Sequence, residues 1–159
     1  MELRLRKVTP DNWREIKVEV RKEQKGSVAS YITTLARAYV YQDSSSIVYA
    51  VYLGDTPVGV LMQRDYYDPD SGLICILDQF FIEGSFQGMG YGRAALELWL
   101  TGIKRQNRYT AVELCFVAQH SSLQVFYEKL GFRRKLEADD GDELVMALPL
   151  VKEDEYESV

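Results

Sequence analysis

The turn Gln87-Gly88-Met89-Gly90-Tyr91-Gly92 has the residue types that most clearly suggest chemistry. It stands between an apolar run and a stretch with helical periodicity. Glycine has no Cβ, so the backbone there can approach an anion closely. The first N–H groups of a helix are unpaired and lie at the positive end of its dipole. The turn therefore predicts a phosphate-binding site, although a tight strand–helix turn that binds nothing fits the glycine spacing equally well.

Two familiar phosphate-binding loops match this turn less well. The dinucleotide-binding fold carries its G-x-G-x-x-G after the first strand, whereas this turn follows the fourth expected strand. A nucleoside-triphosphate loop requires Gly-Lys-Ser or Gly-Lys-Thr, and Gly92 is followed by Arg93. Neither loop is therefore the preferred interpretation.

Asp78 is a carboxylate inside the long apolar run from Leu73 to Ile82. A run without clean alternation is typical of a central strand covered on both faces, and a charged side chain there needs a partner or a function. Asp78 is therefore a candidate catalytic carboxylate, which could act as a base. An Asp that binds an arginine or a backbone amide remains an open alternative. Glu83, expected to be exposed in the following loop, is a weaker candidate.

Tyr127 carries a hydroxyl that could donate a proton. It lies on the apolar stripe of a helix predicted over residues 121–130, together with Leu123, Phe126 and Leu130. An unperturbed tyrosine has a pKa of about 10, so its hydroxyl is protonated and can donate at neutral pH. Core packing alone would also explain an aromatic side chain at this position.

The elements that would position these residues follow the order β α α β β β α β α β β. This order indicates one α/β domain with a mixed sheet. The first helix is expected from Thr9-Pro10 to Val20, on a stripe of Trp13, Ile16 and Val20. The further helices are expected from Ser27 to Tyr39, over 91–106 and over 121–130. Strands are expected over about residues 2–8, 47–53, 58–63, 73–82, 111–117, 132–137 and 144–150.

The composition is that of a single domain with a packed core: 159 residues, of which 47% are hydrophobic. We expect this domain over residues 1–150 and a solvated acidic tail over 151–159. A net charge of −5 argues against a general nucleic-acid binder. No stretch resembles a membrane span or a signal peptide. One histidine and two cysteines without ligand spacing argue against a metal site and a disulfide framework, so we expect a cytoplasmic protein.

Residues Ile82 to Gly92 resemble the acetyl-CoA signature of the GNAT acyltransferases, in which an apolar strand end and a short loop precede Arg/Gln-x-x-Gly-x-Gly/Ala at a helix start. A second family element is similar to the stretch from His120 to Phe132: a polar residue, a short helix with Phe-Tyr, then Leu-Gly-Phe. The expected element order also resembles the family fold over residues 2–150. The resemblance implies a mixed sheet in which strand 73–82 splays from strand 111–117 and opens a slot for the thioester.

The resemblance also implies roles for individual residues. Backbone amides of the turn would hold the CoA pyrophosphate, and the end of strand 73–82 would pair with the pantetheine arm. An amide at Ile82 or a neighbour would stabilise the oxyanion, and Tyr127 would protonate the leaving thiolate. His120 stands where the family usually has Asn, and Gly84 where it often has Pro. Acetyl-CoA would be the cosubstrate, without a metal, and its expected contacts are Phe80, Phe81, Ile82, Gln87, Gly88, Met89, Gly90, Tyr91, Gly92, Arg93 and His120.

The run from Leu77 to Ile82 resembles, within the family, the diamine and spermidine/spermine N-acetyltransferases, which have an acidic residue at the place of Asp78. We therefore expect a polyamine acceptor, bound by Glu19, Glu23, Tyr31 and Asp78. Basic residues between them neutralise much of that segment: Lys17, Arg21, Lys22 and Lys25.

Several alternatives stay open beside this prediction. The acceptor could be another small primary amine or a peptide N-terminus. The chain could also be a catalytically silent acetyl-CoA-binding module or a plain interaction domain. We expect no nucleic acid or membrane as a partner, and a homodimer is compatible with the family, in which dimers are common.

Overall fold

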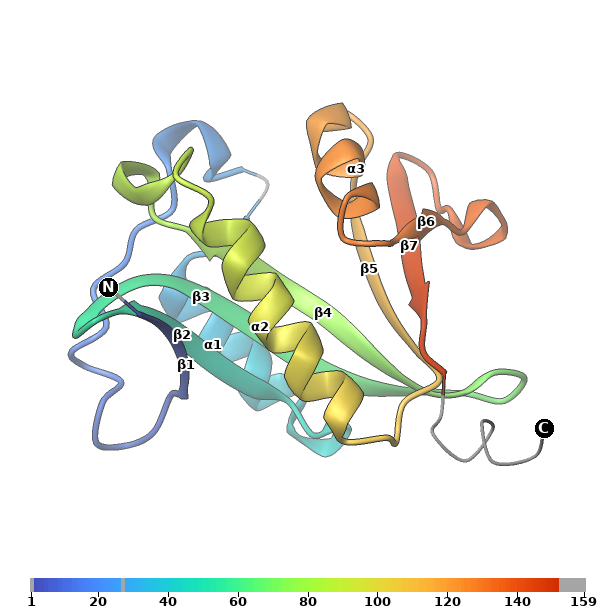
Figure 1. Cartoon of the computed structure of the whole chain (residues 1–159), viewed down its shortest axis with the longest axis horizontal. Coiled ribbons are helices and arrows are strands. Elements are labelled where there is room, and N and C mark those ends of the chain that lie inside the picture. The colour runs from blue at the N-terminus through green and yellow to red at the C-terminus, as the bar shows by residue number, and fades with distance from the viewer. Residues whose placement is uncertain (1, 27, 152–159) are drawn as a thin grey trace. The chain divides into compact units, whose positions relative to one another are not determined.

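The computed structural model describes residues 2–26 and 28–151 (Figure 1). Within them the strands form a seven-stranded mixed sheet in the order β1-β2-β3-β4-β5-β7-β6. β4 and β5 run parallel, whereas β1–β2, β2–β3, β5–β7 and β6–β7 are antiparallel. The elements are β1 (Leu3–Lys7), α1 (Tyr31–Val40), β2 (Ile47–Leu53), β3 (Thr56–Asp68), β4 (Gly72–Ile82), α2 (Tyr91–Arg105), β5 (Ala111–Val117), α3 (Ser121–Glu128), β6 (Arg133–Arg134) and β7 (Glu143–Pro149). The mixed α/β fold expected from the sequence is confirmed.

The chain divides into two compact units, which are described separately. The first unit comprises Met1–Arg64 and Leu77–Thr101, and the second comprises Asp65–Ile76 and Gly102–Val159. The prediction of one acetyltransferase domain over residues 1–150 stays a prediction. The acidic tail predicted over 151–159 falls outside the described residues from residue 152 onward.

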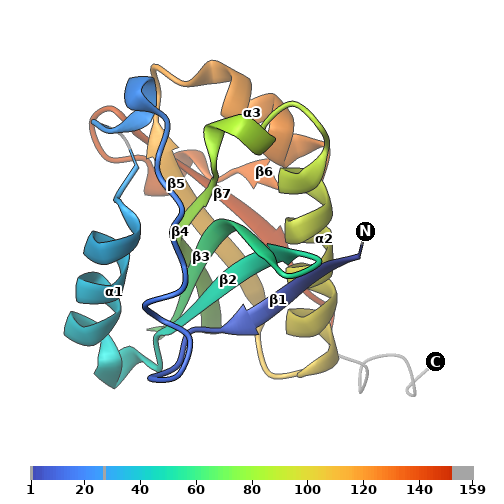
Figure 2. The same cartoon turned by 90° about the vertical axis from the view of Figure 1, so that its left-hand side faces the viewer.

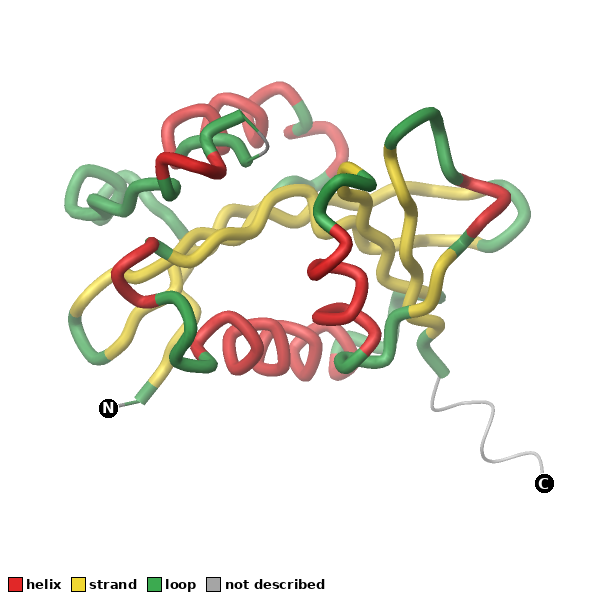
Figure 3. Tube along the Cα trace, turned by 90° about the horizontal axis from the view of Figure 1, so that it is seen from above, coloured by secondary structure: helices red, strands yellow, loops and turns green. Residues whose placement is uncertain are grey.

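The first unit has one helix on each face of its strands (Figures 2 and 3). Adjacent residues of a strand point to opposite faces, so Phe81 packs toward α1 and Ile82 toward α2. This two-sided burial explains why β2 and the end of β4 are continuous apolar runs. The core on the α1 side contains Ile16, Val18, Val20, Tyr31, Val48, Ala50, Tyr52, Val60, Met62 and Phe81. The core on the α2 side contains Val51, Leu53, Val58, Ile82 and Ala95.

The helix expected from Thr9 to Val20 is wrong. Trp13 N donates to Thr9 O over 3.1 Å and Glu15 N to Asn12 O over 3.0 Å, so the chain makes turns there. From Ile16 onward the segment is extended. Ile16, Val18 and Val20 are buried and alternate with exposed residues. A period of two is typical of extended backbone. The predicted helical stripe of Trp13, Ile16 and Val20 left out Val18, which shows this alternation.

The second predicted helix is confirmed as α1, with a later start. Its N-cap is Ser30, whose Oγ accepts a hydrogen bond from Thr33 N over 3.1 Å. Ser27, the residue expected to cap this helix, lies outside the described residues. The helix expected over 91–106 is confirmed as α2.

The second unit contains β5, β7, β6 and α3. The parallel ladder between β4 and β5 joins Ile74 to Ala111, Cys75 to Val112 and Ile76 to Glu113. The strand expected over 132–137 is shorter than predicted, because a 3₁₀ turn over Leu136–Ala138 follows Arg133–Arg134. The helix expected over 121–130 ends at Glu128, before Gly131 with its φ of 101°.

The described helices include none that is long and apolar enough to cross a membrane.

Candidate active site

The glycine turn joins the end of β4 to α2 within the first unit, as Figure 1 shows. Gly88 and Gly90 have φ values of 77° and 86°, a left-handed conformation that residues with a Cβ rarely adopt. A Cβ at either position would meet no atom within 4 Å. Conformation rather than crowding therefore requires glycine here, and the space beside the backbone is open.

Gln87 N donates to Gly84 O over 3.2 Å, but the next three amides of the turn make no backbone hydrogen bond within the part of the chain that the structure describes. Among the described residues, no backbone acceptor is found for the amides of Gly88, Met89 and Gly90, and the first bond of α2 runs from Ala94 N to Gly90 O over 3.1 Å. The N–H groups that open the helix are thus available to a ligand. Successive free amides at the positive end of a helix of 15 residues fit a phosphate group. The turn can therefore hold the pyrophosphate of a cofactor such as CoA.

Gln87 connects this turn to the segment before α1. Its Nε2 donates to Ile82 O over 2.7 Å and to Gln24 Oε1 over 3.1 Å. Its Oε1 accepts from Arg21 Nη1 over 3.1 Å. A Cβ at Gly84 would lie 2.6 Å from Arg21 Cγ, so the proline common in the family could not stand there without a shift of Arg21.

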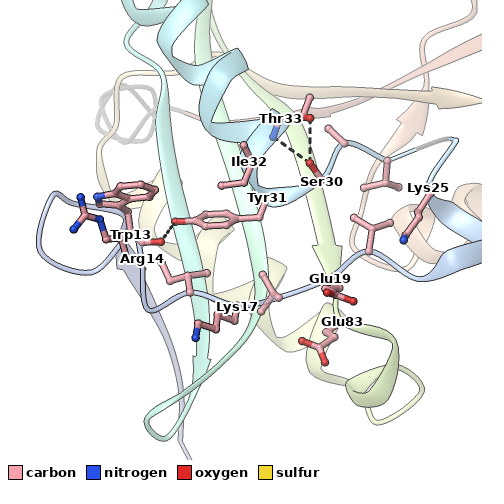
Figure 4. A pocket seen from close by; sticks show the side chains of 15 residues that line it. Trp13, Arg14, Lys17, Glu19, Lys25, Ser30, Tyr31, Ile32, Thr33 and Glu83 are labelled. Atoms are coloured by element: carbon pink, nitrogen blue, oxygen red, sulfur yellow. Dashed lines mark hydrogen bonds between the residues drawn. The ribbon is translucent and has the colours of Figure 1, made fainter.

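A pocket of about 1040 Å³ lies in the first unit, between the segment before α1, the start of α1 and the end of β4 (Figure 4). This is large enough for a small organic ligand or a short peptide. Its floor is apolar, because Ile16, Val18, Val20 and Tyr31 are buried. Glu83 lines the pocket and directly follows Ile82, so the pocket and the glycine turn meet at the end of β4.

The charged residues of the pocket are separated along its length. Figure 4 shows Trp13 and Arg14 at one end and Glu19 and Glu83 at the other. Glu83, expected to be exposed, is only partly exposed, and it accepts a hydrogen bond from Ser85 Oγ over 3.1 Å. Glu19 lines the pocket and has no ion-pair partner among the described residues, and its role in binding the acceptor stays a prediction. The end of the pocket nearest the glycine turn therefore offers carboxylates to a cation.

Two predicted acceptor residues are engaged elsewhere. Glu23 lies outside the pocket lining and pairs with Arg21 at 3.2 Å; hydrogen bonds from its own backbone and from Arg21 lower the pKa of its carboxyl. Tyr31 lines the pocket, but its hydroxyl donates to Trp13 O over 2.8 Å. Burial raises the pKa of this hydroxyl. Tyr31 thus supports the pocket wall and offers a ring face rather than a free hydroxyl.

Asp78 binds two arginines. Its Oδ1 accepts from Arg37 Nε over 2.9 Å and its Oδ2 from Arg64 Nε over 2.7 Å, while its side chain is 3% exposed. Burial alone would raise the pKa of Asp78, but hydrogen bonds from Arg37, Arg64 and Gln79 outweigh it, and the pKa lies below its usual value. A carboxylate with a lowered pKa is a weaker base. This geometry matches the arginine-binding alternative that the sequence left open, and Asp78 is not part of the pocket lining.

Tyr127 is enclosed by aromatic rings in the second unit. Phe116 stacks on it at a centroid distance of 6.2 Å, and Phe126 and Phe132 pack edge-on at 5.1 and 5.7 Å. Burial raises the pKa of its hydroxyl. In the described part of the second unit this hydroxyl has no hydrogen-bond acceptor. A protonated, unengaged hydroxyl is what a proton donor needs. His120, the N-cap residue of α3, precedes this helix.

The amide that follows Ile82 is engaged within the protein. The amide of Glu83 donates to Val58 O over 2.8 Å, and Val58 is the extra residue of a β-bulge opposite Val51 and Tyr52. The amide of Glu83 is therefore not free to stabilise an oxyanion, and the oxyanion role of Ile82 or its other neighbour stays a prediction. The bulge also fixes the end of β4, where the pocket and the turn meet.

Sequence reasoning missed several residues of this region. Trp13 and Arg14 form the far wall of the pocket, and Gln24 binds the glycine turn through Gln87. Alternation from Ile16 to Val20 was the signal that would have placed Lys17 and Glu19 on one side of an extended segment. Nothing local signals the contact of Gln24 with Gln87, which are 63 residues apart.

The described residues contain no group of three or more His, Cys, Asp or Glu side chains that could hold a metal ion.

Comparison with known proteins gives a family model and several solved structures. The model for an acetyltransferase (GNAT) domain matches residues 44–134. An acetyltransferase from Thermus thermophilus superposes with a TM-score of 0.71 at 21% identity, over 94% of this chain and 98% of that one. Comparison with curated protein sequences found no significant match.

Two further structures share the fold at low identity. The ribosomal-protein-S18-alanine N-acetyltransferase from Escherichia coli has a TM-score of 0.69 at 17% identity, over 94% of each chain. The PaiA N-acetyltransferase from Thermoplasma acidophilum, in complex with coenzyme A, has a TM-score of 0.68 at 17% identity, over 94% of this chain and 99% of that one. Because the family model covers more than half of the sequence and includes both the glycine turn and Tyr127, this chain belongs to the GNAT acetyltransferase family.

Proposed function

We propose that this acetyltransferase moves an acetyl group from acetyl-CoA to a primary amine that enters the pocket of Figure 4. The observation that carries the proposal is the position of Glu83, which lines the pocket and begins the loop to the glycine turn. An amine held by carboxylates at this end of the pocket is delivered to the end of β4. That is where the resemblance to the family places the thioester.

The free amides from Gly88 to Arg93 hold the pyrophosphate of the cofactor. Acetyl-CoA supplies the acetyl group as a thioester, whose thiol is a good leaving group. In the family the strand end pairs with the pantetheine arm, and we assign this role to Phe80, Phe81 and Ile82. We also assign a cofactor contact to His120 because of the resemblance to the family.

The transfer forms a C–N bond and breaks a C–S bond. The amine attacks as a neutral nitrogen, so its ammonium must first lose a proton. Tyr127 gives its hydroxyl proton to the leaving thiolate and recovers one from solvent. The raised pKa of Tyr127 keeps this hydroxyl protonated throughout the neutral range.

The carboxylates of the pocket orient the substrate ammonium. Glu83 accepts the proton of this ammonium and passes it to water. Asp78 takes a positioning role. Its neighbour Gln79 donates to Asp78 Oδ1 over 3.2 Å and accepts from Ala29 N over 3.4 Å, and Ala29 lines the pocket. The arginine-bound Asp78 thereby supports the pocket wall rather than the proton transfer.

Spermidine and spermine stay a prediction of the sequence. That prediction required several free carboxylates for several ammonium groups. Glu23 is paired with Arg21, and Asp78 with Arg37 and Arg64. Glu19 and Glu83 remain, which is enough for one ammonium.

Thiol release from acetyl-CoA with a panel of amines tests the proposal. The panel contains spermidine, spermine, a simple monoamine, an aminoglycoside and a peptide with a free N-terminus. We expect release with at least one acceptor and its loss in a Glu19→Gln, Glu83→Gln double variant that still binds CoA. Binding of CoA without release to any acceptor would contradict the proposal and favour a silent acetyl-CoA-binding module.

The Tyr127→Phe variant tests the proton donor. The ring packing is kept, so the melting temperature should change little. We expect kcat to fall by about 100-fold or more, since general acid catalysis typically contributes 10²–10⁴-fold. Turnover close to that of the parent enzyme would exclude Tyr127 as the acid and leave it a core residue.

A further inference from the structure

Arg14 and Lys17 are, with Lys25, the three cations of the pocket lining, and none of the three has an ion-pair partner among the described residues. No carboxylate of the described residues lies within ion-pair distance of Arg14 or Lys17, whereas Arg21, Arg37 and Arg64 in the same unit are all paired. The guanidinium of Arg14 lies over the ring of Trp13, 5.1 Å from its centroid. Both side chains line the pocket. Their positive charge is thus available to a ligand.

These cations stand apart from the carboxylates. In Figure 4, Trp13 and Arg14 lie at the opposite end of the pocket from Glu19 and Glu83, and Lys17 points away from both carboxylates. Lys25 lies at the carboxylate end, where two carboxylates still outweigh it. The floor between the two ends is the apolar surface of Ile16, Val18 and Tyr31.

From this separation we propose that the acceptor carries a carboxylate at the end remote from its reacting amine. The amine lies at Glu19 and Glu83, an apolar stretch covers the floor, and Arg14 and Lys17 bind the carboxylate. This inference rests on the proposed function and names its substrate class: an amino acid or short peptide with a separated ammonium and carboxylate. The pocket volume of about 1040 Å³ accommodates either an amino acid or a short peptide.

The same charges select against a polyamine. A second ammonium at the far end of the pocket would meet two unpaired cations and no carboxylate, and like charges placed together oppose binding. A neutral tail would gain the apolar contact but no ionic one. The expected order of acceptors is therefore anionic tail, neutral tail, cationic tail.

The order is tested by comparing kcat/KM for three six-carbon acceptors that differ only in the tail: 6-aminohexanoate, hexylamine and 1,6-diaminohexane. A second series of C-terminally amidated tripeptides, Gly-Leu-Glu, Gly-Leu-Gln and Gly-Leu-Lys, tests the peptide source. We expect kcat/KM for the anionic member of at least one series to exceed that of the neutral member about tenfold. This preference should weaken at high salt, because both cations are exposed.

The Arg14→Ala, Lys17→Ala double variant ties the preference to these residues. We expect the ratio of kcat/KM for the anionic acceptor to that for the neutral acceptor to fall to about one, because only the anionic tail gains from these cations. Lys22→Ala is the matched control, since Lys22 is an exposed lysine of the same segment outside the pocket lining. It should keep the full ratio.

Direct binding separates this inference from the proposed function. Calorimetry on the CoA-loaded protein should show tighter binding of the anionic acceptor than of the neutral one, and loss of the difference in the double variant. If binding shows this preference but no acceptor is acetylated, the proposed function fails, while the selection of an anionic tail by Arg14 and Lys17 stands. Acetylation with equal rates for the three tails, or faster acetylation of the diamine or the lysine peptide, would overturn the inference and leave the proposed function intact.

Discussion

The glycine turn and Asp78 both place polar groups within or directly after the apolar strand β4. The polar groups of the two regions differ in whether they have partners inside the protein. The carboxylate of Asp78 is buried and receives hydrogen bonds from Arg37, Arg64 and Gln79. Gly88 and Gly90 have open space beside their backbone, and the amides from Gly88 to Gly90 have no backbone acceptor among the described residues. Polar groups that satisfy one another stabilise a fold, whereas polar groups left unpaired are available to a ligand. Both interruptions stood out in the sequence, and only the pattern of partners distinguishes their roles.

Removal of the Asp78 carboxylate should have the largest effect on stability. Asp78→Ala leaves two guanidiniums without their anion. Loss of one partner of a buried pair typically costs about 3–5 kcal/mol. Because the Arg37 and Arg64 side chains are 38% and 22% exposed, we expect a smaller loss, about 2–3 kcal/mol in urea unfolding. CoA affinity should stay unchanged. A stable variant with a changed pH–rate profile would show instead that Asp78 acts in proton transfer.

Distortion of the glycine turn should lower CoA affinity strongly and stability only modestly, the reverse of what we expect for Asp78→Ala. A Gly90→Val variant forces a β-branched residue into a left-handed conformation, at a cost of about 1–2 kcal/mol in stability. We expect CoA affinity to fall about tenfold or more, measured by calorimetry, because the amides lose their arrangement. Gly102→Ala is the matched control: Gly102 lies in α2, a Cβ there meets no atom within 4 Å, and the substitution should stabilise by about 0.5–1 kcal/mol. Equal CoA affinity in Gly90→Val and the parent protein would contradict the role of the turn.

Acid should weaken the protein partly through Asp78. Its folded-state pKa lies below the unfolded value of about 3.9. The ion pairs therefore contribute fully above that value, and their contribution is lost as the pH falls through the lower folded-state pKa. We expect the unfolding free energy to drop below about pH 4, and less steeply in Asp78→Asn. Parallel curves for the two proteins would show that Asp78 does not contribute to acid sensitivity.

An exposed pair in α2 should show the smallest effect. Arg93 Nε and Glu97 Oε1 lie 2.8 Å apart, with side chains 55% and 53% exposed. Exposed helical pairs of this spacing contribute about 0.3–0.5 kcal/mol, so Glu97→Ala should destabilise by no more than that. This variant is the matched comparison for Asp78→Ala, since both remove a carboxylate from arginine. A loss as large as that of Asp78→Ala would mean that burial does not separate the two pairs.

The sequence predicted the fold well wherever local signals were strong. Glycines followed by a stretch with helical periodicity marked the turn and α2. The long apolar run from Leu73 to Ile82, which lacks clean alternation, marked a strand covered on both faces. The segment before α1 failed because Trp13, Ile16 and Val20 match a helical spacing by coincidence. Val18 completes the alternation that the chain follows.

The partners of the candidate site were beyond local reasoning. Arg37 and Arg64 lie 41 and 14 residues from Asp78, so no periodicity links them. The same holds for Arg14, which shares a pocket with Glu83 only because the extended segment passes beside the end of β4. The residue type of Asp78 showed that a charge was placed unusually in an apolar strand. Only the tertiary structure shows which charged side chains form ion pairs with one another.

The most direct test of the account is calorimetry with two ligands, CoA and pantetheine, which lacks the pyrophosphate. If the free amides of the glycine turn hold that pyrophosphate, the parent protein binds CoA much more tightly than pantetheine, and Gly90→Val removes most of the difference without unfolding the protein. Equal affinities for the two ligands, or no binding of CoA by the folded parent protein, would contradict the central claim.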